Sequence, residues 1–128
     1  MSYHFSKKVS LPFEEAVARV TESLKKEGFG ILTQINVKEI LKKKLNVDFR
    51  KYLILGACNP PHAYQALQLE DKIGLMLPCN VVVQEGDEGV TEVSAVDPVA
   101  SMQAIDNPGL NDVAGKVQAM LRSVIDNL

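Results

Sequence analysis

The chain has no tryptophan, and aromatic residues make up only 5% of its 128 positions. Proteins that hold single-stranded nucleic acid without sequence preference stack its bases on aromatic side chains. This chain has few aromatic side chains for such stacking. The formal net charge of −2 provides no general attraction to nucleic acid or to an anionic membrane. No apolar run approaches the ~20 residues that a membrane-spanning helix needs. We therefore expect neither nucleic acid nor a membrane as a partner.

Cysteine is also scarce, and the two present are too few for a disulfide-stabilised scaffold. The N-terminal residues MSYHFSKKVS lack the hydrophobic core of a signal peptide, which predicts a cytoplasmic protein with reduced thiols. A glycine-rich phosphate loop, an HExxH motif, a GxSxG motif and the protein kinase motifs are all absent. The sequence therefore names no reaction.

What is present is the composition of one soluble globular domain, residues 1–128, with 46% hydrophobic and 23% charged residues. No linker, repeat or low-complexity tract divides it. The hydrophobic periodicity predicts strands at 3–9, 29–35, 52–57, 81–83 and 90–96, long helices at 13–26 and 110–128, and short helices at 36–45 and 61–70. Residues 101–108 fit either a helical turn or an ordered loop. The predicted fold is α+β, with an antiparallel sheet and the two long helices packed on one of its faces.

The segment from Tyr52 to Val83 contains both cysteines, one of the two histidines and two related motifs, CNP at 58–60 and PCN at 78–80. Each motif borders an apolar run that predicts a buried strand. If these two strands are antiparallel neighbours, the end of the first lies beside the start of the second. We therefore predict that Cys58 and Cys79 lie close together, near the beginning of a helix.

Three interpretations of these cysteines remain open. Cys58, His62 and Cys79 could bind a soft metal such as zinc, with a fourth ligand from water, a carboxylate or a partner subunit. Alternatively, a thiol near a helix N-terminus can have a lowered pKa and act as a nucleophile or half of a redox pair. Free cysteines are also often no more than small buried apolar residues.

Three further polar residues could contribute to a ligand pocket at this end of the sheet. The amides of Asn59 and Asn80 could bind a carboxylate or carbonyl group, and Asp97 could serve as a base or metal ligand. The competing interpretation is that each of them stabilises a turn through its own side chain.

The only basic cluster lies on and near the short helix at 36–45. It consists of Lys38, Lys42, Lys43 and Lys44, with Arg50 and Lys51 nearby. A run of this kind usually forms the solvated face of a helix. The functional alternative is a contact with an anion or a protein.

Several motifs together resemble the family catalogued as domain of unknown function 302. They are LGACNP at 55–60, AL at 66–67, IGLMLPCNVVV at 73–83 and VSAVDP at 93–98. The resemblance runs over essentially the whole chain. It implies an antiparallel sheet similar to half of the TATA-binding protein fold, and it also implies dimerisation. It implies no activity, and this chain lacks the basic, wedge-bearing sheet that DNA binding by such a fold uses.

A physical argument also predicts a homodimer. The strands at 52–57 and 81–83 are apolar on both alternating sets of positions, so the second face of the sheet needs a cover. The two short helices or a second subunit could provide it, and a subunit contact could complete a metal site at Cys58, His62 and Cys79. We rank the functional hypotheses as a ligand- or metal-binding module first, a thiol-dependent or redox enzyme second, and a structural or interaction protein with inert cysteines third.

Overall fold

The computed structural model describes residues 2–128 and shows an α+β fold, as predicted. Five strands form one antiparallel sheet in the order β1-β5-β4-β3-β2. The strands are β1 (His4–Val9), β2 (Gly30–Asn36), β3 (Tyr52–Cys58), β4 (Cys79–Glu85) and β5 (Thr91–Val96). The helices are α1 (Phe13–Lys26), α2 (Val37–Leu45), α3 (Pro60–Leu69), α4 (Pro98–Ser101) and α5 (Pro108–Asp126), with a short 3₁₀ helix at Ile73–Met76.

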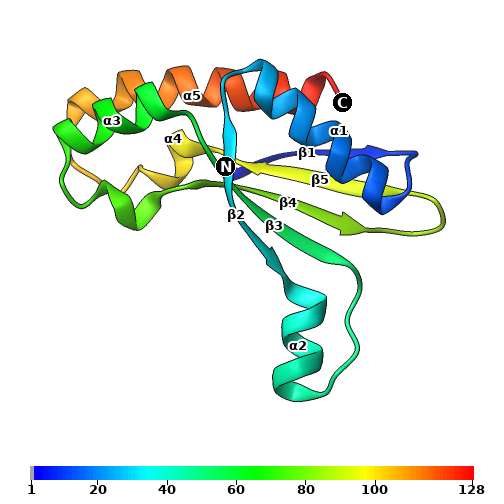
Figure 1. Ribbon diagram of the computed structural model, residues 1–128. Helices are drawn as coiled ribbons and strands as arrows, with labels where there is room; N and C mark the ends of the chain where they lie inside the picture. The colour runs from blue at the N-terminus through cyan, green and yellow to red at the C-terminus, as the bar shows by residue number, and fades with distance from the viewer. Residues whose placement is uncertain (1) are drawn as a thin grey trace.

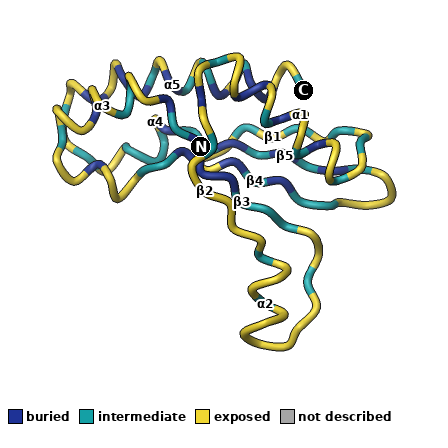
Figure 2. The backbone as a smooth tube through the Cα atoms, viewed as in Figure 1, coloured by how far each residue is buried: buried dark blue, intermediate teal, exposed yellow. Residues whose placement is uncertain are grey.

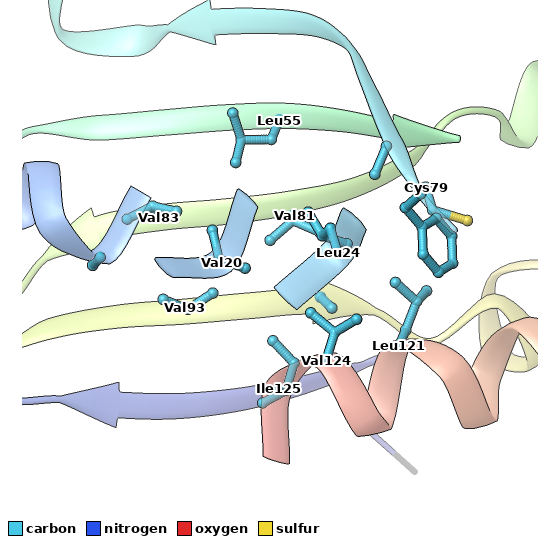
Figure 3. Close-up of a cluster of buried hydrophobic side chains, with 14 of the residues drawn as sticks. Val20, Leu24, Leu55, Cys79, Val81, Val83, Val93, Leu121, Val124 and Ile125 are labelled. Atoms are coloured by element: carbon cyan, nitrogen blue, oxygen red, sulfur yellow. The ribbon is translucent and has the colours of Figure 1, made fainter. Parts of the chain in front are cut away.

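The core lies between the sheet and the two long helices, α1 and α5, which cover the same face as predicted (Figure 1). Side chains alternate along each strand, so Val81 and Val83 of β4 and Val93 of β5 are buried beneath these helices (Figure 3). Each fully buried aliphatic side chain of this kind stabilises the fold by about 1.5–3 kcal/mol.

The position of α5 follows from its apolar stripe. Leu110, Val113, Val117, Leu121 and Val124 recur at helical spacing, and all five are buried. Met120 and Leu128 continue the same helical spacing and are partly buried against the core. No helix within residues 2–128 combines the length and the apolar character needed to cross a membrane.

The structure extends two of the predicted elements and adds a third. Strand β4 begins at Cys79 and ends at Glu85, so it is longer than the valine run alone predicted. Helix α3 begins at Pro60 because Asn59 caps it, one residue before the expected start. A single helical turn that was not predicted, α4, is capped by Asp97 and ends at Ser101, so the ambiguous segment at 101–108 consists mainly of turns up to Asn107.

The short helices do not cover the second face of the sheet, so one of the two alternatives left open by the sequence does not apply. Helix α3 packs against α5 on the side of the long helices, and α2 projects away from the sheet with β2 and the chain leading into β3 (Figure 1). No residue of α2 is buried. Figure 2 shows this projection as almost entirely exposed.

Candidate functional site

Cys58 and Cys79 lie at the same end of neighbouring strands, as predicted. Cys58 is the last residue of β3 and Cys79 is the first residue of β4. These strands are antiparallel, and Ala57 is paired directly with Cys79. The tight approach of the strands at this point requires glycine at position 56, because a Cβ there would collide with Thr33 Oγ1 and with the ring of Pro78.

A small apolar cavity of about 30 Å³ lies at this end of the sheet. Four of the predicted site residues line it, namely Cys58, Asn59, His62 and Cys79. The remaining wall is apolar and comes mainly from α3, α5 and the segments before β4 and after β5: Phe29, Ala57, Ala63, Ala66, Leu77, Pro78, Pro98, Met102, Val113, Ala114 and Val117. Since one water needs about 10–15 Å³ by this measure, the cavity has room for about two water molecules.

Asn59, in the wall of the cavity, is hydrogen-bonded on two sides. Its side-chain oxygen accepts a hydrogen bond from the backbone N–H of His62, which caps α3, and it lies 2.8 Å from His62 Nδ1. Its amide nitrogen donates to the backbone carbonyl of Glu27 at 3.2 Å. This second contact fixes the amide orientation, because the carbonyl can only accept. His62 Nδ1 therefore donates to Asn59, and in the neutral ring the lone pair resides on Nε2.

The turn that follows α1 is shaped to receive Asn59. Gly28 has φ +84°, in the left-handed region that favours glycine, and a Cβ there would lie 3.1 Å from the amide nitrogen of Asn59. Asn59 is only 8% exposed. Its buried amide nitrogen donates a hydrogen bond to the carbonyl of Glu27. The same nitrogen lies 3.8 Å from Met120 Sδ.

The two thiols have different environments. Burial raises the pKa of the Cys79 thiol to about 11, and the charge of nearby Cys58 adds a smaller effect in the same direction. The expectation of a lowered pKa is therefore wrong for Cys79, because its side chain is buried in the apolar core instead of facing a helix N-terminus. Cys58 is partly exposed and immediately precedes the cap of α3.

The cavity does not contain an assembled catalytic pair or metal cluster. Over residues 2–128, no hydrogen bond joins Cys58 to His62, and a nucleophile needs such a contact with its base. No group of three or more histidine, cysteine, aspartate or glutamate side chains in this part of the chain is arranged to hold a metal ion.

Asn80 and Asp97 do not line the cavity. Asn80 is exposed on the opposite face of the sheet, paired across the strands with Gly56. The carboxylate of Asp97 caps α4 by accepting from the backbone N–H groups of Val99 and Ala100, and both of its oxygens accept from Gln118 Nε2. The hydrogen bonds of Asp97 therefore support the interpretation that its side chain stabilises a turn.

Sequence reasoning missed most of the cavity wall. Val113, Ala114 and Val117 of α5, together with Met102, line the same cavity as the cysteines but come from a distant part of the chain. The apolar stripe of α5 predicted that Val113 and Val117 are buried, but it gave no indication of the residues that they would contact.

The comparisons with known proteins agree with the fold. The family model described as domain of unknown function DUF302 matches residues 5–128, and no curated protein matches the chain. Among solved structures, the chain is similar to the crystal structure of an uncharacterized conserved DUF302 protein from Bacillus stearothermophilus. The two are 33% identical, with a TM-score of 0.91 over 99% of this chain and 98% of that one. The chain belongs to the DUF302 family.

Proposed function

We propose that this protein is a binding module for a small ligand at the cavity lined by Cys58, Asn59, His62 and Cys79. An apolar recess with a few convergent polar groups at one end is the usual form of a small-molecule site. Here the recess between α3 and α5 is almost wholly apolar, and Cys58, Asn59 and His62 are among the residues that line it.

The orientation of His62 is the observation that carries this proposal. Asn59 holds Nδ1 at 2.8 Å and is itself held by the Glu27 carbonyl, so the neutral ring offers the lone pair of Nε2. A histidine positioned in this way accepts a hydrogen bond or coordinates a cation. The fitting ligand is a small compound that presents an alcohol, amine or thiol group to Nε2.

The size of the cavity limits what can enter it. About 30 Å³ accommodates a water-sized group, so only a small terminal group fits between α3 and α5 without movement of the wall. A larger ligand requires displacement of the segment that includes Leu77 and Pro78, which lines the cavity just before β4.

A soft metal ion is the second candidate ligand. Histidines that bind metals almost always donate their other ring N–H to an oxygen, and His62 makes such a contact with Asn59. Thiolates such as those of Cys58 and Cys79 favour zinc or monovalent copper. Binding would require the three side chains to rearrange, because residues 2–128 contain no preformed group of three ligands.

The thiol-enzyme alternative has less support. The raised pKa of Cys79 keeps its thiol protonated near neutral pH, and protonated thiols are poor nucleophiles. Only Cys58 remains as a candidate, and His62 makes no hydrogen bond to it among the residues that the structure describes. The burial of Cys79 also fits an inert structural role.

The test is a titration of ¹⁵N-labelled protein, monitored by NMR, with a set of small alcohols, amines and thiols and separately with zinc and monovalent copper. We expect at least one probe to shift the resonances of cavity residues, and His62→Ala to abolish the effect. His4→Ala is the matched control, because His4 is the other histidine and is exposed on β1. Absence of any shift at the cavity, or equal binding by His62→Ala, would refute the proposal.

The titrations with zinc and monovalent copper distinguish the metal site from the small-molecule site. Saturation at one ion per chain that is lost in both His62→Ala and Cys58→Ser supports the metal site, whereas shifts with organic probes alone support the small-molecule site. Elemental analysis of the purified protein provides an independent measurement of bound zinc or copper.

A further inference from the structure

We propose that the protein attaches to the surface of membranes that contain anionic phospholipids, through a projecting segment that we call the arm. The arm is residues 36–51, comprising α2 and the chain that returns to β3. The far end of the arm inserts among the lipid headgroups and does not cross the bilayer. This attachment is independent of the ligand site, because the arm adjoins the beginning of β3 and the cavity lies at its end.

The arm projects from the body of the protein. Figure 1 shows α2 pointing away from the sheet, with the turn that follows it at the far end. The arm leaves uncovered the open face of the sheet, which is the surface away from α1 and α5. Helix α2 has nine residues, none of them buried, and extends for about 14 Å at a rise of about 1.5 Å per residue. Its far end therefore lies clear of the sheet.

The far end of the arm exposes apolar side chains. Leu45, the last residue of α2, is 65% exposed, and Val47, two positions later, is 44% exposed. Ile40, on the same helix, is 39% exposed. Asn46 ends the helix in the left-handed conformation, with φ 54°, and the chain turns back toward β3 after it. Exposed apolar side chains that cluster in this way are typical of a surface that contacts another molecule or a membrane.

Basic residues occupy the same end of the arm. Lys42, Lys43 and Lys44 lie in the last turn of α2, immediately before Leu45, and all three are exposed. Lys42 lies 3.4 Å from Asp48, with both side chains largely exposed, and an ion pair of this kind contributes little. Within residues 2–128, Lys43 and Lys44 form no ion pair. Lysines beside exposed apolar residues are typical of segments that bind anionic lipid headgroups.

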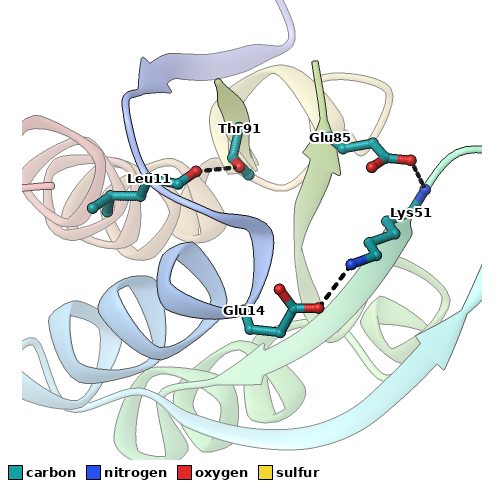
Figure 4. Close-up of polar contacts among 5 residues, drawn as sticks. All are labelled: Leu11, Glu14, Lys51, Glu85 and Thr91. Atoms are coloured by element: carbon teal, nitrogen blue, oxygen red, sulfur yellow. Dashed lines mark hydrogen bonds and ion pairs between the residues drawn. The ribbon is translucent and has the colours of Figure 1, made fainter. Parts of the chain in front are cut away.

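The base of the arm is bound to the body of the protein, so its direction is fixed. The backbone N–H of Lys51 donates to Glu85 at 2.7 Å, and the Lys51 ammonium group lies 2.9 Å from Glu14 (Figure 4). Arg50 Nε donates to Gln84 at 3.0 Å. The two basic residues nearest the body are therefore engaged within the protein. The arm presents its far end without first having to become ordered.

The net charge of the chain combines two parts of opposite sign. The arm contains six basic and two acidic residues, a net charge of +4; the whole chain has −2, so the remainder carries −6. Exposed charges further apart than the Debye length, about 8 Å at physiological ionic strength, are largely screened from each other. Because α2 is longer than this, the acidic body does little to offset the attraction between the lysines at the far end and an anionic surface. The expectation of no membrane partner followed from the net charge and from the lack of a spanning segment, and neither of these registers a basic arm.

The combination of apolar and basic side chains favours a lipid surface over a nucleic acid. A nucleic acid presents phosphates to the lysines, but it offers no apolar phase for Leu45 and Val47. An anionic bilayer offers both, because its charged headgroups lie directly above the acyl chains. Helices shorter than about 12–15 residues are marginal in water without tertiary packing, so contact with the bilayer also stabilises α2.

The first test is cosedimentation with phosphatidylcholine vesicles that either contain or lack phosphatidylserine. We expect the wild type to bind only the vesicles that contain phosphatidylserine. Leu45→Glu should weaken this binding at least about tenfold, because it places a carboxylate where an apolar side chain inserts. Leu75→Glu is the matched control and should bind like the wild type, because Leu75 is 82% exposed and lies in the 3₁₀ helix outside the arm. Thermal melts check that both variants are folded. No binding by the wild type, or equal weakening by both variants, would overturn the proposal.

The second test concerns the lysines. The double variant Lys43→Gln, Lys44→Gln should bind the anionic vesicles roughly 20- to 30-fold more weakly, since each lysine near such a surface contributes about fivefold in affinity. The matched control is Lys25→Gln, Lys26→Gln, because these lysines are also exposed in the last turn of a helix, α1. Raising the salt concentration from about 0.05 to about 0.5 M should also weaken the binding. Equal weakening by the two double variants would overturn the proposal, since the attraction would then come from the chain as a whole.

Insertion of the far end is tested by fluorescence. Because the chain contains no tryptophan, Leu45→Trp provides a single reporter at the far end of the arm, and Leu75→Trp provides one outside it. Anionic vesicles should shift the emission of Leu45→Trp to shorter wavelength, as the reporter enters the headgroup region, and leave that of Leu75→Trp unchanged. If the emission of Leu45→Trp did not shift while the protein bound heparin or duplex DNA, the partner would be a polyanion and the proposal would be overturned.

Discussion

The same Cys-Asn pair occurs at two places in this chain, and the structure treats the two copies differently. At 58–59, the cysteine is partly exposed, and the asparagine is 8% exposed and caps α3 with its side chain. At 79–80, the cysteine is 8% exposed within the core and the asparagine is exposed on the open face of the sheet. The burial of the two residue types is therefore reversed between the two copies.

The residues that follow each pair explain the reversal. Cys79 and Asn80 begin a strand, and strand alternation sends the cysteine to the core and the asparagine to the opposite face. Cys58 ends a strand, and Pro60 and Pro61 after it begin a helix. Asn59 thus becomes a helix cap whose side chain turns inward, toward Glu27 and His62. A short motif acquires its role from the element that it begins or ends.

The largest expected difference between the two copies is in thiol reactivity. A pKa of about 11 against an ordinary value of 9.0 leaves the Cys79 thiol roughly a hundredfold less ionised at pH 8. In the variant Cys58→Ala, we expect native Cys79 to react with Ellman's reagent at least a hundredfold more slowly than in urea. Cys58, measured in Cys79→Ala, should react in the folded protein. Rapid labelling of native Cys79 would contradict its placement in the core.

The second-largest expected difference is between the contributions of the two asparagines to the free energy of unfolding. Asn59→Ala removes the cap of α3 and leaves the partly buried Glu27 carbonyl without its partner, so we expect a loss of about 2–4 kcal/mol. Asn80→Ala, its matched control, should change the stability by less than about 0.5 kcal/mol. Urea denaturation measures both, and similar midpoints for the two variants would show that Asn59 has no special role.

Much of the fold could be predicted from the sequence because the apolar patterns are local. The stripe of α5 and the valines of β4 specify their buried faces without reference to the rest of the chain. The antiparallel pairing of β3 with β4, which the sequence analysis assumed, is present in the structure. Asn80 was predicted to share a ligand pocket with Asn59, but it does not line the cavity. The sequence pattern alone does not specify on which face of the sheet a single polar residue at a strand end lies. The wall from Val113 to Val117 depends on a packing contact between distant segments, which no local pattern encodes.

The raised pKa of Cys79 also predicts a dependence of stability on alkaline pH. Below about pH 9 the Cys79 thiol is protonated in both the folded and unfolded states. Its full contribution to the free energy of unfolding is present in this range. Between pH 9 and 11 the unfolded chain loses the proton while the folded protein retains it, so stability falls as the pH rises. The loss reaches about 2–3 kcal/mol for a shift of this size.

Other groups titrate in the same range, so the measurement is a comparison with Cys79→Ala. Urea unfolding at several pH values between 8 and 11 should give a steeper decline for the wild type than for this variant. Cys58→Ala should follow the wild-type slope. Parallel curves for the wild type and Cys79→Ala would show that the Cys79 thiol titrates normally.

The smallest expected difference comes from replacing each sulfur by oxygen. Cys79→Ser puts a hydroxyl among apolar core residues, and a buried hydroxyl without a partner costs about 1–3 kcal/mol. Cys58→Ser leaves its hydroxyl partly exposed, so the loss should be under about 1 kcal/mol. Cys79→Ala separates polarity from lost volume, because it removes the sulfur without adding a polar group. If Cys79→Ser were as stable as Cys58→Ser, a polar partner or a water would have to reach position 79, and the cavity beside it would be wetter than its apolar lining indicates.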